Sequence, residues 1–242
     1  MNPPGHRLAG RYTRGYLPHI RVPGRRYFVT FRLDGTLPQE ELLDYQRERD
    51  ELIRQAESEA HQLSGADQKR LFELYSARIE YYLDAGRGDC WLKETRVAEI
   101  VAQALRFFVN SRYALGAWVV MPNHVHVLVR PLGEHTLDSI LKSWKGFTAR
   151  EANKILGRTG EHFWAHEYYD HWLRDDEEKA RLTAYIHDNP RVAGLCERPE
   201  DWLWSTAHPR WQGGGKGGSK ASLPADKNVG ATGEGAADGP PS

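Results

Sequence analysis

The sequence predicts an α+β fold in which helices pack on an antiparallel sheet. Strand-like and helix-like stretches interleave along the chain, and two of the strand-like runs, Leu115–Met121 and His124–Arg130, are adjacent. The short Pro122-Asn123 connection between them indicates a hairpin or a bulged bend. With 242 residues, of which 40% are hydrophobic, the chain is long enough to bury the core of one main domain.

The first half of the chain begins with a basic arm, which we place at residues 1–24 because arginines alternate there with glycines and prolines. Tyr27–Leu33 is the first predicted strand, and the turn signal Asp34-Gly35 ends it. Two charged stretches, Gln39–Leu63 and Asp67–Ala85, predict a solvated helical hairpin.

Helices and a further strand are predicted in the second half of the chain. A stripe of apolar residues at helical spacing predicts the helix over Lys93–Asn110. Asp175 with Glu178 forms a capping-box pattern at the start of the last predicted helix. We expect the last helix to end before Pro190, since proline disfavours helical backbone in the preceding residue. The expected elements are a helix over Lys93–Asn110, a helix opening at Thr136, a strand over Glu167–Arg174 and a helix over Asp176–Asp188.

Composition limits the class of protein. No apolar run approaches the roughly 18 residues that a membrane span needs, and two distant cysteines, Cys90 and Cys196, suggest no disulfide framework. We therefore expect a cytoplasmic protein without membrane association. The formal net charge is zero, but the first segment is rich in arginine and residues 38–99 are rich in acids. Such a distribution of charge permits a basic binding face that the net charge of zero conceals.

The sequence His124-Val125-His126 carries the first functional signal. Side chains alternate along a strand, so the two imidazoles share one face while Val125 points to the other. Neutral imidazole is the commonest metal ligand. An isolated HxH is a weak motif, because two hydrogen-bonded histidines near a strand end would look the same.

A second signal lies in the last predicted helix. Tyr185 and Asn189 are four residues apart and share a helix face. If that face looks onto the His124/His126 strand, the site holds two imidazoles, one amide oxygen and one phenol. Mixed nitrogen and oxygen ligands with open positions suit Mg²⁺ or Mn²⁺ that must also bind a phosphate.

The motifs in their order resemble a known family. The HVH run after Trp118-Val119-Val120-Met121-Pro122-Asn123 is followed by Phe163-Trp164, the stretch Tyr168–Arg174, Tyr185-Ile186 with Asn189-Pro190, and Asp201-Trp202 with Trp204. This series, together with Leu17–Ile20 and Tyr27–Leu33, resembles the REP-associated tyrosine transposases, which are HUH single-tyrosine transposases. The resemblance covers about residues 16–204 except the charged segment near 39–90, which looks longer than in small members.

The resemblance implies a ferredoxin-like HUH transposase fold with a charged helical insertion at 39–90. The domain would span 25–211, and the Gly-rich residues 212–242 predict a disordered tail. His124 and His126 would be metal ligands, Asn189 the third protein ligand of Mg²⁺ or Mn²⁺, and Tyr185 the nucleophile. The family nicks single-stranded DNA, forms a 5′-phosphotyrosine link and releases a 3′-hydroxyl that can rejoin strands.

The expected partner is single-stranded or hairpin DNA from repetitive extragenic palindromes, bound by a monomer or a homodimer. Phosphate contacts and base stacking hold such substrates. Trp164, Tyr168 and Trp172 are candidates for stacking, although core packing is equally compatible. The candidate phosphate-binding residues are Arg11, Arg14, Arg21, Arg25, Arg26, Lys142, Lys145 and Arg150.

Two other classes remain open. The chain could be a structure-specific DNA or RNA hairpin-binding protein that keeps the fold without cutting. A zinc hydrolase using His124 and His126 is weaker, because the sequence has no HExxH helix and an amide is an unusual zinc ligand. Tyr168 and Tyr169 are alternative nucleophiles to Tyr185.

Overall fold

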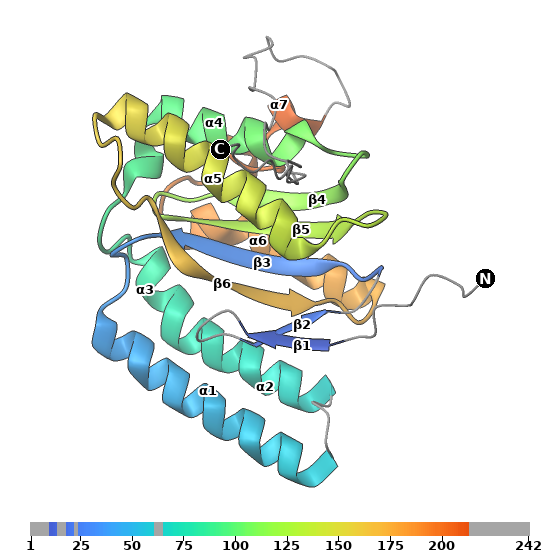
Figure 1. Cartoon of the computed structure of the whole chain (residues 1–242). Helices are drawn as coiled ribbons and strands as arrows, with labels where there is room; N and C mark the ends of the chain where they lie inside the picture. Colours follow the sequence, from blue (N-terminus) through green and yellow to red (C-terminus); the bar gives the residue numbers. More distant parts are fainter. Residues whose placement is uncertain (1–9, 14–17, 22–23, 61–64, 213–242) are drawn as a thin grey trace, which may run out of the picture.

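A four-stranded antiparallel sheet forms the centre of the computed structural model, with its strands in the order β4-β5-β3-β6 (Figure 1). The strands are β3 (Tyr27–Leu33), β4 (Tyr113–Val120), β5 (His124–Pro131) and β6 (Trp164–Trp172). The structure describes residues 10–13, 18–21, 24–60 and 65–212.

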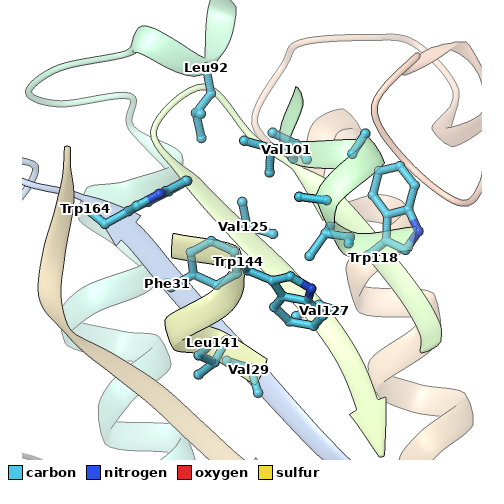
Figure 2. Packing of buried hydrophobic residues seen from close by; sticks show 14 of the residues in the cluster. Val29, Phe31, Leu92, Val101, Trp118, Val125, Val127, Leu141, Trp144 and Trp164 are labelled. Atoms are coloured by element: carbon cyan, nitrogen blue, oxygen red, sulfur yellow. The ribbon is translucent and has the colours of Figure 1, made fainter. Parts of the chain in front are cut away.

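Two helices cover one face of this sheet. Helix α4 (Thr95–Phe107) leads into β4, α5 (Leu137–Leu156) connects β5 to β6, and the two helices pack against each other. The order β-α-β-β-α-β with this strand arrangement is the ferredoxin-like one, so the predicted fold class is confirmed. Figure 2 shows the core beneath these helices, where Val125 and Val127 of β5 meet Trp144 of α5.

The opposite face of the sheet is covered by helix α6 and by the charged helical segment. Helix α6 spans Asp176–Val192. The segment consists of α1 (Gln39–Ala60), α2 (Gly65–Tyr75), a π-helical turn η1 (Ser76–Glu80) and α3 (Tyr81–Asp84). Phe28 and Leu128 of the sheet meet Ile79 and Leu83 of the segment and Ile186 of α6 in a second core.

This second core corrects the expectation of a solvated helical hairpin. The outer face of the segment is charged, but Tyr45, Ile53, Ile79 and Leu83 are each less than 4% exposed. The segment therefore closes one face of the sheet. The prediction failed because these apolar residues pack against the distant sheet and α6, and the many charges around them in the sequence do not indicate such packing.

The end of helix α6 also differs from the prediction. The sequence predicts an end at Asp188, but the helix continues to Val192 with Pro190 inside it. Proline lacks the N–H that would bond the Ile186 carbonyl. Hydrogen bonds beyond the proline close the last turn, since the Ala193 amide donates to the Asn189 carbonyl at 3.0 Å. A helix tolerates one missing hydrogen bond near its end when the backbone groups of the following turn are hydrogen-bonded.

The remaining predicted elements lie within three residues of their expected bounds, except that Asp67–Ala85 is divided into α2, η1 and α3. Part of the expected extended arm forms an antiparallel pair of strands, β1 (Gly10–Thr13) and β2 (Pro18–Arg21). Of the predicted tail, residues 212–242, Gln212 ends a short helix and residues 213–242 lie outside the described residues. The smaller elements are η2 (Trp91–Lys93), η3 (Pro199–Asp201) and α7 (Pro209–Gln212).

Within the described part of the chain, every helix is too short or too polar to span a bilayer.

Candidate active site

Two imidazole rings from β5 lie together on the α6 side of the sheet. His124 and His126 alternate with Val125 and Val127, whose side chains belong to the core under α4 and α5. The Nε2 atoms of the two rings are 3.0 Å apart, and both side chains are fully buried. The strand therefore presents two ring nitrogens to one point.

Hydrogen bonds on the far side of each ring fix this orientation. The Asn123 amide donates from Nδ2 to the Arg87 carbonyl at 3.1 Å, which turns its Oδ1 toward His124 Nδ1 at 2.7 Å. An oxygen can only accept, so Nδ1 of His124 carries the proton and Nε2 of the neutral ring carries a lone pair. His126 Nδ1 bonds Thr30 Oγ1 at 2.7 Å, from the position opposite it on β3.

Both histidines are neutral at physiological pH. Burial lowers the pKa of His124 from 6.5 to about 3. Burial, and then the charge that His124 would carry, lower the pKa of His126 well below its ordinary value. Because a metal ion binds neutral imidazole, a buried pair held in this state suits a ligand role.

Helix α6 brings Tyr185 and Asn189 to the same place. The Asn189 amide nitrogen is 3.3 Å from the Tyr185 hydroxyl, and the Tyr185 and His126 ring centroids are 5.4 Å apart. Asn189 is 2% exposed, and its Oδ1 is buried without a hydrogen-bond partner. A buried amide oxygen without a donor costs free energy unless something absent from the structure, such as a cation, binds it.

Two carboxylates that the sequence analysis missed complete the cluster. Asp84 Oδ1 lies 3.8 Å from His124 Nε2 and 3.5 Å from Asn189 Nδ2. Burial raises the pKa of Asp84 to about 6, and the hydrogen bond from Asn189 opposes the rise. Glu80 is 5% exposed and accepts a hydrogen bond from the Tyr185 hydroxyl. The only sequence signal was their spacing of four residues, on a helical segment interpreted as solvated.

The Tyr185 hydroxyl is a weak acid in this setting. Its pKa lies well above 10, first because the group is buried and then because the negative charges of Glu80 and Asp84 oppose a phenolate. A positive charge at the site would lower this pKa again, because it would offset the negative charges of the two carboxylates.

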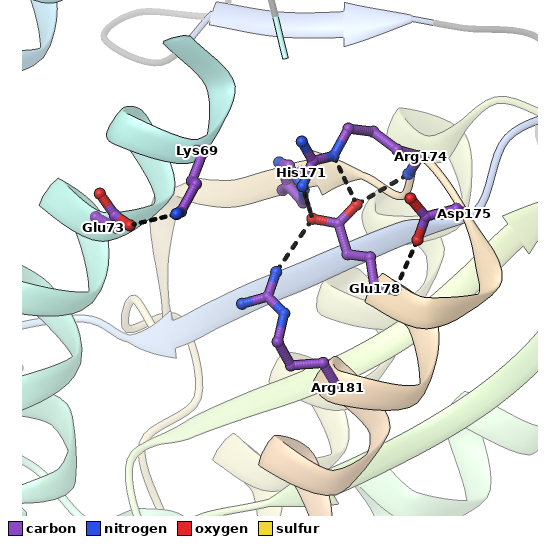
Figure 3. A network of polar contacts seen from close by, with 7 residues as sticks. All are labelled: Lys69, Glu73, His171, Arg174, Asp175, Glu178 and Arg181. Atoms are coloured by element: carbon purple, nitrogen blue, oxygen red, sulfur yellow. Dashed lines mark hydrogen bonds and ion pairs between the residues drawn. The ribbon is translucent and has the colours of Figure 1, made fainter. Parts of the chain in front are cut away.

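A buried carboxylate in the first turn of α6, that of Glu178, ties the start of this helix to the end of β6 (Figure 3). Glu178 bonds His171 Nε2 at 3.0 Å, the Arg174 amide at 2.9 Å and the guanidinium of Arg181 at 3.3 Å. Asp175 caps the helix by accepting from the Glu178 amide at 2.7 Å. These contacts set the position of the helix that carries Tyr185.

The donor set fits a divalent metal ion. Ligand atoms of Asp84, His124 and His126 all lie within 4.8 Å of one another. Two ligands about 2.1 Å from an octahedral ion and at right angles are about 3.0 Å apart, which is the separation of the two Nε2 atoms. The cluster could therefore hold a metal ion, and the orphaned Asn189 oxygen lies beside it.

The predicted phosphate-binding residues whose side chains the structure describes lie on α5 and just before β3. Lys142 and Arg150 are exposed on α5, whereas the Lys145 ammonium donates to the carbonyls of Ala165 and His166 at 2.7 and 2.8 Å. Lys145 is thus engaged in joining α5 to β6. Arg14 lies outside the described residues, and the side chains of Arg11 and Arg21 are not described.

The two arginines next to β3 contact the start of α6 and the strand before it. Arg26 pairs with Asp176 at 2.8 Å, and both side chains are well exposed. Arg25 lies over the Trp172 ring with 5.3 Å between its guanidinium carbon and the ring centroid. Both groups remain accessible at one edge of the sheet.

Two of the candidate stacking residues belong to the core. Trp164 is 7% exposed and donates to Thr148, and Tyr168 is 7% exposed and donates to Asp138. Trp172 is partly exposed beneath Arg25. Of the three candidates, only Trp172 presents ring surface to solvent.

The sequence of the site matches a known class of proteins. Residues 91–189 match the family described as "Transposase IS200 like". The matched segment contains both histidines, Tyr185 and Asn189, and it excludes Glu80 and Asp84. This part of the chain is therefore similar to the IS200-like transposases.

Two curated relatives that the chain resembles are named as REP-associated tyrosine transposases. The REP-associated tyrosine transposase of Escherichia coli K12 is 26% identical over 97 residues, which are 40% of this chain and 55% of the relative. A candidate REP-associated tyrosine transposase of Haemophilus influenzae is 29% identical over 98 residues, 37% of this chain and 56% of the relative. The chain thus spans about half the length of the curated relatives it matches.

Solved structures give weaker similarity. A REP-associated tyrosine transposase bound to a REP hairpin aligns with a TM-score of 0.42 and 18% identity, over 81% of this chain and 82% of that one. A candidate transposase from Deinococcus radiodurans aligns with a TM-score of 0.32 and 13% identity, over 77% of this chain and 97% of that one.

Proposed function

We propose that the chain is a metal-dependent tyrosine transposase that cleaves single-stranded, hairpin-containing DNA and rejoins strands. The observation that carries the proposal is the meeting of the Tyr185 hydroxyl with Asn189, beside two inward-facing histidine nitrogens. His124, His126 and Asn189 hold Mg²⁺ or Mn²⁺. The substrate is a repetitive extragenic palindrome, as the names of the curated relatives suggest.

The residues suit this chemistry. Tyr185 Oη forms a bond to the phosphorus of the scissile phosphodiester while the bond from phosphorus to O3′ breaks. The phenol loses one proton and the departing O3′ gains one, which leaves a 5′-phosphotyrosine and a free 3′-hydroxyl. When bound, the metal ion supplies Lewis-acid chemistry at a non-bridging phosphate oxygen. Because the aryl phosphodiester conserves the bond energy, a 3′-hydroxyl can reverse the step.

The position of Tyr185 on a packed helix supports its role. Helix α6 holds Tyr185 at a fixed position relative to β5. Its phenol oxygen therefore approaches a bound phosphate from a constant direction. Tyr168 and Tyr169 are less suited, since Tyr168 donates to Asp138 in the core and Tyr169 stacks on Tyr75 with 3.8 Å between ring centroids.

The wider assignments belong to the same proposal. Residues 25–211 form the transposase domain, residues 39–90 are its insertion, and residues 1–24 with Arg25, Arg26, Lys142 and Arg150 contact phosphates. The protein acts in the cytoplasm as a monomer or a homodimer.

A covalent-adduct assay tests the proposal. The protein is incubated with a hairpin oligonucleotide from its own genome and Mg²⁺ or Mn²⁺, and the adduct is detected as a band shift on a denaturing gel. We expect the adduct with wild type, Tyr168→Phe and Tyr169→Phe, and none with Tyr185→Phe, whose hairpin binding stays within about twofold. An adduct in Tyr185→Phe would overturn the assignment of the nucleophile, and tight hairpin binding by wild type without any adduct would favour the non-cleaving alternative.

A further inference from the structure

The charged helical segment contributes both carboxylates of the candidate site. Glu80 ends the π-helical turn η1, and Asp84 ends α3 directly after it. Both residues precede the segment that matches the IS200-like family, which begins at residue 91. They therefore reach the site from outside the matched region.

Helix geometry explains why both carboxylates point the same way. Residues four apart share a helix face, so Glu80 and Asp84 lie one turn from each other. Ile79 and Leu83 precede them by one residue each and anchor that side of the helix in the second core. A π-helical turn adds a residue to the repeat and rotates the face that follows, and such turns occur frequently at functional sites.

Asp84 lies where a fourth ligand would be. Its Oδ1 is 3.8 Å from His124 Nε2 and lies beside the Asn189 amide, whose Oδ1 has no hydrogen-bond partner. No lysine or arginine of the described residues forms an ion pair with Asp84. A bound cation would stabilise a partly buried carboxylate that lies this close to two neutral imidazoles and an orphaned amide oxygen.

Glu80 lies against the nucleophile. It accepts the hydrogen bond of the Tyr185 hydroxyl, while Asn189 donates to the same oxygen. The two bonds together restrict rotation of the hydroxyl. The lone pair of Tyr185 Oη that stays free has a fixed direction.

We propose that the helical insertion is a working part of the catalytic centre, in which Asp84 is a carboxylate ligand of the metal ion and Glu80 is a positioning residue for the Tyr185 hydroxyl. The proposal rests on the proposed function. The ligand set becomes two imidazole nitrogens, one amide oxygen and one carboxylate oxygen. A carboxylate strengthens the preference for hard ions such as Mg²⁺ and Mn²⁺.

Metal binding without DNA tests the role of Asp84. Free Mn²⁺ is titrated by electron paramagnetic resonance in wild type, Asp84→Asn, His124→Ala and the control Asp44→Asn, an acidic residue of α1 that pairs with Arg47. We expect Asp84→Asn to weaken Mn²⁺ binding at least tenfold, His124→Ala to abolish it and Asp44→Asn to leave it unchanged. Thermal melts in chelator establish that each variant is folded.

The outcomes separate this proposal from the proposed function. Wild-type Mn²⁺ affinity in Asp84→Asn, with loss in His124→Ala, would overturn the ligand role of Asp84 and leave the histidine site in place. Wild-type affinity in His124→Ala would overturn the metal site itself.

The role of Glu80 is tested by the rate of adduct formation in a single turnover. Glu80→Gln keeps an acceptor oxygen and should form the adduct within about threefold of the wild-type rate, whereas Glu80→Ala should be at least tenfold slower. Hairpin and Mn²⁺ affinities should stay within twofold in both, as in the control Glu73→Ala on the exposed side of α2. Equal rates in Glu80→Gln and Glu80→Ala, or loss of Mn²⁺ binding in either, would overturn the positioning role.

Discussion

The side-chain nitrogen of Asn189 lies 3.5 Å from Oδ1 of Asp84, a contact between residues 105 positions apart in the chain. It joins helix α6 to the end of the charged helical segment. The two histidines of β5 lie beside this contact. Three separate segments of the chain thus meet at one point, and each can be tested on its own.

Loss of either histidine should separate catalysis from DNA binding. We expect His124→Ala and His126→Ala to lower the rate of adduct formation at least about 100-fold, since a metal ion stabilises the transition state by several kcal/mol. Hairpin affinity, measured by fluorescence anisotropy, should fall less than about threefold, because affinity comes mainly from phosphate and stacking contacts. Undiminished cleavage in either variant, or full activity in excess chelator, would contradict the metal role.

The partly buried carboxyl of Asp84 should make the metal-free protein less stable as pH rises. The fold raises the pKa of Asp84 from 3.8 to about 6, so the folded state favours the protonated form and loses stability between about pH 4 and pH 6. Asp84→Asn should therefore raise the free energy of unfolding in chelator at pH 7.5 by about 1–3 kcal/mol and change it little at pH 4. Urea denaturation at the two pH values measures both, and a less stable variant at pH 7.5 would contradict the prediction.

The Glu178 network should stabilise the protein at neutral pH. Burial alone would raise the pKa of Glu178, but hydrogen bonds from His171 and Arg174 lower it well below its ordinary value. A carboxylate with a lowered pKa contributes stability above its unfolded pKa and loses it as pH falls. Glu178→Gln should cost about 3 kcal/mol at pH 7 and less at pH 3 in urea denaturation. Glu177→Gln, an exposed neighbour, is the control.

The two lysines of α5 should behave differently. Lys142→Ala should reduce the slope of log affinity against log salt concentration by roughly 1 if Lys142 contacts a phosphate. Lys145→Ala should instead lower the melting temperature and leave the slope unchanged, because its ammonium bonds two backbone carbonyls. The same salt slope in wild type and Lys142→Ala would remove α5 from the DNA-binding surface.

Deletion of residues 1–24 should weaken hairpin binding and flatten its salt dependence. The removed arm carries four arginines, at positions 7, 11, 14 and 21. In duplex DNA the slope falls by about 0.9 for every phosphate that the protein no longer neutralises. Titrations at several salt concentrations check this. An unchanged slope would assign the arm to folding or to no role in binding.

The spacing rules predicted the parts of the site that depend on local geometry. The alternation of β5 places His124 and His126 together, and the helical repeat places Tyr185 beside Asn189. Both rules act over a few residues, so a single sequence suffices to apply them. The cap at Asp175 was predictable for the same reason.

Glu80 and Asp84 could not be found in this way. Their role depends on how a helical segment folds back over the sheet, and its many surface charges mask the buried stripe that includes Ile79 and Leu83. The π-helical turn that ends at Glu80 also shifts the helical phase that sequence periodicity assumes. The end of α6 was predicted four residues too early, at Asp188. The backbone hydrogen bonds of the turn after Pro190 offset the one bond that proline cannot make.

The alternation along β5 separates the two sides of the sheet by a single residue, with valines in the dry core and histidines at the site. A one-residue insertion or deletion before His124 that moved the pairing register would exchange the two sets. The valines would then occupy the site, and two polar rings would enter the core beneath α5. The pairing register of β5 thus decides which side chains reach the candidate site, and a change of length in the β4-β5 connection would keep the histidines there only if that register is preserved.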